Sequence, residues 1–231
     1  MNQIEKYQAG GDSHPIFQSA AQGDLVGVRK HLEDGIDPRA ENPTGPSLLA
    51  VALSPSRSFS VDLLKLLIEF GADLNRPLNR FGETPLLRAV NSGEINLVRL
   101  LVENGANVTG TETPALVGAV ANGNSAIFDY LIEHGADVNE SDASGRTLMH
   151  SAALANQVEM LGRLHALGLE IDAQDNKGRT PLALAAMKGA EGSVEWLVEN
   201  GADPAICDRT RRNPLAWAKE NGHNRVERAL T

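Results

Sequence analysis

The sequence has little cysteine and no long apolar run. Cys207 is the single cysteine among 231 residues, so no disulfide can form within the chain, as is usual in a reducing compartment. No segment approaches the roughly 18 consecutive apolar residues of a membrane-spanning helix. The first residues, MNQIEKYQAGGDS, lack the apolar core of a secretory signal peptide. These features predict a soluble, cytoplasmic protein.

Positive charge is also scarce. The chain has 21 Lys and Arg residues against 30 Asp and Glu residues, which gives a formal net charge of −9. That sign disfavours binding to nucleic-acid phosphates and to acidic membrane surfaces, so we expect neither a nucleic acid nor a membrane as partner. A protein partner of basic or mixed charge fits the sign better.

Sequence signatures of catalysis and of metal binding are missing too. The chain has no phosphate-binding loop, no nucleophile elbow and no dinucleotide-binding glycine pattern. No two of its six histidines stand four positions apart, the spacing that places two metal ligands on one helical face. We therefore expect no enzymatic activity, no cofactor and no metal site.

What the sequence does have is an internal repeat. Similar apolar segments end at six glycines separated by 36, 34, 30, 33 and 33 residues, namely Gly35, Gly71, Gly105, Gly135, Gly168 and Gly201. A second recurrent segment has a mostly small sixth residue, namely Ser19, Val51, Ala89, Ala119, Ala152, Ala185 and Ala218. Self-similarity at this period indicates a stack of repeated supersecondary units.

Each part of the repeat has a physical reason. In Thr84-Pro85 and Thr180-Pro181 the hydroxyl can cap free N–H groups at a helix start, where the missing proline donor costs nothing. The small residue after them lets neighbouring helices approach closely. The segment INLVRLLVENG, which ends at Gly105, has apolar residues at helical spacing and a glycine suited to the left-handed position after a helix. The pattern therefore predicts two helices per repeat.

These segments resemble the ankyrin repeat, in which a turn is followed by T-P-L-H-x-A-A-x-x-G and by an outer helix that ends L-L-x-x-G-A-D. The resemblance implies an all-α ankyrin-repeat solenoid of helix-turn-helix units with short β-hairpin or loop fingers, over residues 14–231. We expect residues 1–13 to be a flexible N-terminal leader. The expected repeats span about 14–40, 41–77, 78–110, 111–140, 141–173, 174–206 and 207–231.

Several features depart from the regular pattern. The segment SPSRSFS at 54–60 adds four residues between two helices, and we interpret it as a tolerated insertion, with a regulatory or docking element as the alternative. The turn at 107–113 is about three residues short, which predicts a receding tip. His150 occupies the histidine position of the family and is expected to brace the hairpin. Trp196 and Trp217 are expected in the core.

By resemblance, ankyrin arrays bind proteins with the hairpin tips and the concave face of the inner helices. The register places ten candidate partner-binding residues there, namely Arg80, Phe81, Arg88, Asn91, Arg146, Leu154, Arg179, Met187, Lys188 and Arg212. Phe81 is the best single anchor among them, because an aromatic residue at an exposed turn has little structural reason to be there.

Two alternatives remain open for most of the other candidates. Arg146, Arg179 and Arg212 recur every 33 residues and either balance aspartates of the same period or meet an acidic strip on a partner. Leu154 and Met187 either form the apolar centre of an interface or pack against a neighbouring repeat. Arg88, finally, either reaches into the groove or pairs with a carboxylate.

The sequence therefore predicts a monomeric, non-catalytic module that binds a protein through its concave groove and hairpin tips. One alternative is an inhibitor, such as an immunity protein or antitoxin, that neutralises a basic enzyme, with the acidic charge speeding association. A second is a host-directed effector or a scaffold. The identity of the partner does not follow, because a fold does not by itself imply a function.

Overall fold

The computed structural model describes residues 14–40, 42, 45–54, 60–109 and 114–231. Within these residues the chain forms fourteen helices in seven successive pairs and contains no β-strand. Contacts between Cα atoms divide the chain into two compact units, Met1–Asn107 and Val108–Thr231. The predicted all-α class is therefore confirmed.

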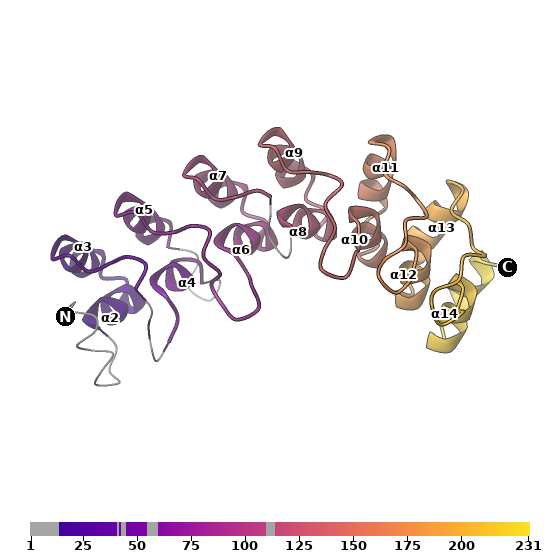
Figure 1. The fold of residues 1–231 in the computed structure, drawn as a ribbon, viewed down its shortest axis with the longest axis horizontal. Coiled ribbons are helices and arrows are strands. Elements are labelled where there is room, and N and C mark those ends of the chain that lie inside the picture. Colours follow the sequence, from indigo (N-terminus) through magenta and orange to yellow (C-terminus); the bar gives the residue numbers. More distant parts are fainter. Residues whose placement is uncertain (1–13, 41, 43–44, 55–59, 110–113) are drawn as a thin grey trace. The chain divides into compact units, whose positions relative to one another are not determined.

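Each pair consists of a first helix, here called the inner helix, and a second, called the outer helix. The pairs of the first unit are α2 (Pro15–Gln22) with α3 (Leu25–Glu33), α4 (Leu48–Ala52) with α5 (Val61–Glu69), and α6 (Pro85–Ser92) with α7 (Ile95–Glu103). Those of the second are α8 (Ala115–Ala121) with α9 (Ser125–Glu133), α10 (Leu148–Leu154) with α11 (Val158–Ala166), α12 (Pro181–Lys188) with α13 (Glu191–Glu199), and α14 (Pro214–Asn221) with α15 (Asn224–Ala229). Within each unit, inner helices form one row and outer helices another (Figure 1).

Side-chain caps define where the inner helices begin. Thr84 Oγ1 accepts a hydrogen bond from the Leu87 N–H at 3.2 Å, and Thr180 Oγ1 accepts one from the Ala183 N–H at the same distance. The proline that follows each threonine is the first residue of its helix. Each cap satisfies a backbone donor that the helix itself leaves without an acceptor. The predicted helix starts at these two positions are confirmed.

Small side chains lie where the inner helices meet. Ala152, Ala185 and Ala218 have no exposed surface, and they belong to α10, α12 and α14. Helix α12 contacts α10 and α14. Because alanine carries a single methyl group, the two backbones can approach closely while the surrounding leucines still pack.

The outer helices are amphipathic, as the sequence pattern predicts. In α7, Leu97, Val98 and Leu101 are buried, whereas Asn96 and Arg99 are exposed. Helices α5, α9 and α11 likewise bury an apolar stripe. A helix pair of this size cannot bury such a stripe alone, so its stability comes from contact with neighbouring pairs.

The turn between an inner and an outer helix requires a residue with positive φ. Most pairs use glycine there, for example Gly189 with φ 76°, but the turn between α10 and α11 uses Asn156 with φ 57°. Asparagine tolerates this region better than most residues with a side chain. The Asn156 side chain also accepts a hydrogen bond through Oδ1 from the Ser193 N–H of α13 at 2.8 Å. Asn156 thus forms the turn and links it to the next repeat.

Some expectations are corrected, and some fall outside the described residues. Trp196 and Trp217 are half-buried rather than buried. The ring of Trp196 makes an edge contact with His165, with the centroids 5.8 Å apart, and Trp217 is covered on one face by an arginine. The leader at 1–13, most of the insertion (55–59) and the tip of the short turn (110–113) lie outside the described residues.

The double role of Asn156 leads to a stability prediction. Asn156→Ala keeps a Cβ at positive φ but loses the amide that makes this region tolerable and removes the bond to Ser193, so we expect a loss of about 2 kcal/mol. Asn156→Gly removes the bond but suits the positive φ, so it should lose about 1 kcal/mol. Urea unfolding followed by circular dichroism measures both. The control is Asn200→Ala, at an exposed asparagine with φ −99°; an equal loss there would contradict the account.

Candidate protein-binding surface

The loop before each of three inner helices in the second unit ends in a tight finger. We call residues 142–146 finger 5, residues 175–179 finger 6 and residues 208–212 finger 7. In finger 6 the Asp175 N–H donates to the Arg179 carbonyl at 3.0 Å, and Asp175 Oδ1 accepts from the Lys177 and Arg179 N–H groups at 2.8 and 2.9 Å. Asp142 and Asp208 make the equivalent bonds. The fingers are therefore hydrogen-bonded loops, closed by an aspartate at the base.

Backbone hydrogen bonds also join one finger to the next. The Asn176 N–H donates to the Ser144 carbonyl at 2.9 Å, which joins fingers 5 and 6. The Arg209 N–H donates to the Lys177 carbonyl at 3.0 Å, which joins fingers 6 and 7. The three fingers form a row whose spacing is fixed by the backbone.

His150 braces two of these fingers, as its position in the repeat predicts. Its ring is fully buried, and Nδ1 accepts a hydrogen bond from the Thr147 N–H at 3.1 Å. Nε2 lies 2.9 Å from the Arg179 carbonyl oxygen and donates to it in the neutral tautomer that this arrangement requires. Burial lowers the pKa of His150, although the hydrogen bond to Arg179 and the charge of Asp175 oppose the shift. The His150 imidazole therefore has a structural role.

Arg179 is the buried member of the periodic arginines. Its Nε and Nη2 donate to Asp175 Oδ2 at 2.9 and 2.6 Å, and its side chain is only 8% exposed. Burial raises the pKa of Asp175, but the hydrogen bonds from Arg179 and Lys177 outweigh it, and the pKa lies below its ordinary value. Arg179 thus neutralises the aspartate that closes its own finger.

Arg212 stacks on an indole ring and pairs with a carboxylate outside its own finger. Its guanidinium carbon lies 3.5 Å from the centroid of the Trp217 ring, and Nη1 is 2.8 Å from Glu220 Oε2. Nε donates to Thr210 Oγ1 at 2.8 Å, while the Trp217 indole N–H donates to Asp208 Oδ2 at 3.1 Å. The side chain is half-buried and engaged on several sides.

Arg146 is the third of the periodic arginines, and its environment differs from those of Arg179 and Arg212. It is half-buried, and its Nε is buried without a hydrogen bond in the described part of the chain. Equal sequence spacing has therefore placed the three arginines in three different environments. The pairing of Arg179 with Asp175 fits the interpretation that these arginines balance the aspartates of the same period.

The first unit carries a large exposed aromatic side chain at finger 3 (residues 79–83). Phe81 is 76% exposed, and its backbone N–H donates to Asn79 Oδ1 at 2.9 Å. The Leu78 N–H donates to the Glu83 carbonyl at 2.7 Å and closes the loop. The Arg80 guanidinium lies 4.9 Å from the centroid of the Phe81 ring. The tip is thus an ordered loop that presents a phenyl ring and a stacked cation.

Two more candidates of the first unit lie on α6. Arg88 pairs with Glu83, with Nη2 and Oε2 2.6 Å apart, so the structure matches the carboxylate alternative. The hydrogen bond from Arg88 holds the pKa of Glu83 below its ordinary value, although burial opposes the shift. Asn91 is exposed. Arg88 therefore supports finger 3 from below, whereas Asn91 is accessible.

The remaining candidates lie at the ends of inner helices in the second unit. Leu154 and Met187 are both half-buried, so each combines packing with an accessible apolar surface. Lys188 is exposed in the last turn of α12. The carbonyl oxygen of Met187 lies 3.2 Å from His223 Nε2, which ties the end of α12 to the next repeat.

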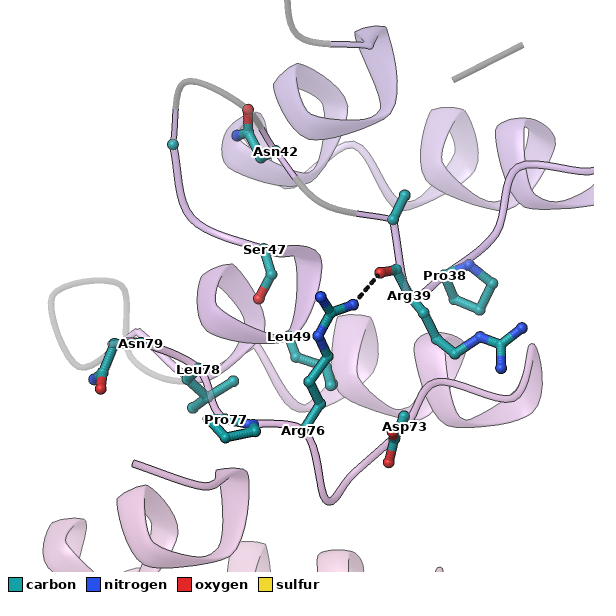
Figure 2. A pocket seen from close by; sticks show the side chains of 12 residues that line it. Pro38, Arg39, Asn42, Ser47, Leu49, Asp73, Arg76, Pro77, Leu78 and Asn79 are labelled. Atoms are coloured by element: carbon teal, nitrogen blue, oxygen red, sulfur yellow. Dashed lines mark hydrogen bonds between the residues drawn. The ribbon is translucent and has the colours of Figure 1, made fainter. Parts of the chain in front are cut away.

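The first unit also has a cleft that the sequence did not suggest. Figure 2 shows it between the loop that contains Arg39 and the loop that contains Arg76, with a volume of about 220 Å³. Arg76 Nη1 donates to the Arg39 carbonyl at 3.0 Å, and Arg39 pairs with Asp37 at 3.0 Å. The hydrogen bond from Arg76 thus joins the two loops that border the cleft.

The ten candidates also omit exposed cations that the structure places on fingers 6 and 7. Lys177, Arg209 and Arg211 are exposed, and none forms an ion pair within the described ranges. A signal for Arg211 was present in the sequence, since it stands 33 residues after Gly178, in a position that is glycine in fingers 3, 5 and 6.

Neither a metal site nor a membrane span is found in the described part of the chain. No group of three or more His, Cys, Asp or Glu side chains is placed to hold a metal ion among these residues. None of the helices formed by the same residues is long and apolar enough to cross a bilayer.

The buried state of His150 predicts a pH dependence of stability. Its folded pKa is lowered, so the unfolded chain binds a proton more readily and stability falls as the pH drops below about 6.5. His14, whose pKa is lowered by burial and by His31, contributes with the same sign. Urea midpoints measured from about pH 7.5 to about pH 5.5 should therefore decrease.

In His150→Gln the decrease with pH should become smaller, because one of the two groups is gone. The overall stability of this variant should also be lower, since the bond to Arg179 is disturbed. His165→Gln, at an exposed ring, is the matched control. An unchanged pH slope in His150→Gln would contradict the assignment.

Comparison with known proteins identifies the repeat. A family model described as ankyrin repeats (3 copies) matches residues 16–112 and 156–231. A second model, described as ankyrin repeats (many copies), matches residues 116–161.

Curated relatives carry the same repeat within longer chains. The ankyrin repeat protein nuc-2 of Neurospora crassa is 27% identical over 233 residues, covering 99% of this chain and 22% of the relative. The ankyrin repeat and KH domain-containing protein mask-1 of Caenorhabditis elegans is 30% identical over 204 residues, covering 83% and 7%. Palmitoyltransferase AKR1 of Lachancea kluyveri is 32% identical over 248 residues, covering 98% and 29%. The chain spans less than a third of each of these three relatives, and it belongs to the ankyrin repeat family.

Proposed function

We propose that this chain is a non-catalytic module that binds a protein partner through the tips of its fingers and the accessible side of its inner helices. Ankyrin repeats imply protein–protein interaction as the general role. The observation that carries the proposal for this chain is the exposure of Phe81, which leaves 76% of a large apolar residue in water. Burying that ring against a partner removes apolar surface from water, and the isolated chain does not obtain this favourable free energy.

The setting of Phe81 suits a binding anchor. Finger 3 is closed by its own hydrogen bonds, and Glu83 at its base is held by Arg88. A loop that is ordered before binding loses little conformational entropy when a partner arrives. Arg80 adds a cation beside the ring, and aromatic and arginine side chains dominate the energetics of many interfaces.

The other candidates take different parts in this proposal. Asn91 and Lys188 are exposed and offer polar contacts, whereas Leu154 and Met187 add partial apolar surface. Arg179 acts only through the shape of finger 6, because its side chain is buried. We propose a monomeric chain acting in the cytoplasm, with a partner of basic or mixed charge.

A more specific alternative is an inhibitor that neutralises a basic enzyme. The observation in its favour is the net charge of −9, which would speed the approach of a cationic partner. A scaffold or host-directed effector remains a further alternative within the same binding class. Strong salt dependence of the association rate with the identified partner would favour the inhibitor over both.

Phe81→Ala tests the proposal directly. The partner is first captured from native lysate on the immobilised chain, identified by mass spectrometry and purified. Its affinity is then measured by calorimetry. Loss of a buried aromatic anchor should weaken binding by about 2 kcal/mol, roughly thirtyfold in Kd, with no change in melting temperature.

The matched control is Val26→Ala, because Val26 is 82% exposed on outer helix α3 of the same unit. This variant should bind like the wild type. The proposal fails if no protein is retained by the wild-type chain. Equal weakening by both substitutions would overturn the assignment of finger 3.

Leu154→Ala and Met187→Ala separate the two interpretations of these side chains. If they contribute to the interface, each substitution weakens binding by about 1 kcal/mol, a several-fold rise in Kd. This rise exceeds any change caused by loss of stability. If they only pack, the melting temperature falls and Kd for the folded chain is unchanged. Calorimetry and thermal unfolding on the same samples distinguish the outcomes.

A further inference from the structure

Finger 7 contains an arginine in a backbone conformation that favours glycine. Arg211 has φ 64°, and the equivalent residues of the other fingers are Gly82, Gly145 and Gly178, with φ of 74°, 72° and 75°. A non-glycine residue without a short polar side chain is disfavoured in this region. The chain thus carries a local backbone cost at this fingertip, and the side chain that causes the cost is a cation.

The guanidinium of Arg211 makes no ion pair with any residue that the structure describes. The side chains of Arg211, Arg209 and Lys177 are exposed and make no ion pair in the described residues. The nearest finger carboxylates are already occupied. Asp175 is held by Arg179, and Asp208 accepts from the backbone of finger 7, from Thr210 and from Trp217. Three positive charges therefore remain available on a chain of net charge −9.

A cleft lies between fingers 6 and 7, and two of these cations, Lys177 and Arg209, line it. It has a volume of about 290 Å³, and its lining includes Lys177, Arg209, Thr210, Arg212 and Trp217. The half-buried indole of Trp217 gives the cleft an apolar wall, while its N–H is bound to Asp208. Long aliphatic stems of the lining cations add further apolar surface.

We propose that fingers 6 and 7 bind an acidic peptide segment of a protein partner. Carboxylates of the segment pair with Lys177, Arg209 and Arg211, and an apolar side chain of the segment enters the cleft against Trp217. This proposal rests on the proposed protein-binding function and names the chemistry of one partner segment. The backbone bond between Arg209 and Lys177 fixes the spacing of the two fingers before the segment binds.

A peptide fits this surface better than a nucleic acid. An extended polyanion gains affinity by neutralising many phosphates along a continuous basic track. Here two exposed cations, Lys177 and Arg209, line the cleft, Arg211 lies on the same finger as Arg209, and the chain as a whole is acidic. A short segment with a few carboxylates can meet these cations without bringing a long negative charge close to the rest of the protein.

The first experiment measures binding by fluorescence anisotropy to the full chain. The probe is a fluorescein-labelled peptide of alternating glutamate and glycine with a central leucine, and glutamine replaces glutamate in the comparison peptide. The acidic peptide should bind, and more weakly as salt is raised. Arg211→Gln and Arg209→Gln should each weaken binding about fivefold, the upper range for an exposed ion pair. Arg228→Gln, at an exposed arginine of α15, should have no effect.

The second experiment uses Arg211→Gly, which separates binding from folding. Glycine relieves the backbone cost, so the melting temperature should rise by about 3 °C while affinity for the acidic peptide falls. A melting temperature below that of the wild type would show that Arg211 supports the fold and would overturn the proposal. Equal peptide binding by Arg211→Gly and the wild type would also overturn it.

A labelled DNA duplex tests the other class of occupant. Tighter binding of the duplex than of the peptide, lost in Arg211→Gln, would replace the peptide proposal with a nucleic-acid site. If the acidic peptide does not bind but the immobilised chain still captures a partner that depends on Phe81, this proposal fails and the proposed function stands. If capture fails as well, both fail.

Discussion

No helix pair in this chain can bury its own apolar face, and the rest of the structure depends on that constraint. Helix α12 contacts α10 and α14, and all of its residues from Pro181 to Ala186 are buried. Helix α14, which contacts α12, buries only Pro214 and Ala218. Burial is therefore a property of adjacent pairs, and the stability of each repeat is inseparable from that of its neighbours.

The same dependence on neighbours orders the loops that carry the candidate binding residues. His150 of one repeat holds the Arg179 carbonyl of the next, and the Arg209 N–H holds the Lys177 carbonyl. Short loops without strand pairing would otherwise sample many conformations. Because these bonds are made in the unbound chain, fingers 6 and 7 can present side chains such as those of Lys177 and Arg209 at little entropic cost on binding.

Local signals in the sequence were sufficient for the fold but only partly for the surface. Caps such as Thr180 and the position of Phe81 on an exposed turn follow from neighbouring residues alone, and the structure agrees with both. The environments of the periodic arginines could not be predicted from neighbouring residues in this way. Arg179 pairs with a buried aspartate, whereas Arg212 lies over an indole ring that the repeat of Arg179 lacks, since the position of Trp217 is Leu184 there.

The sequence by itself determined the repeat, the helix starts and the all-α class, since these depend on interactions within a few residues. Only the tertiary structure decided which charges are used internally and which remain available. Arginine and aspartate stand four residues apart in both fingers 6 and 7, yet their charged atoms are 2.6 Å apart in Arg179–Asp175 and 3.9 Å apart in Arg212–Asp208, so the spacing alone does not decide the pairing. For Arg211 the repeat register indicates a glycine-like backbone position, but only the structure shows that the side chain is exposed and makes no ion pair in the described residues.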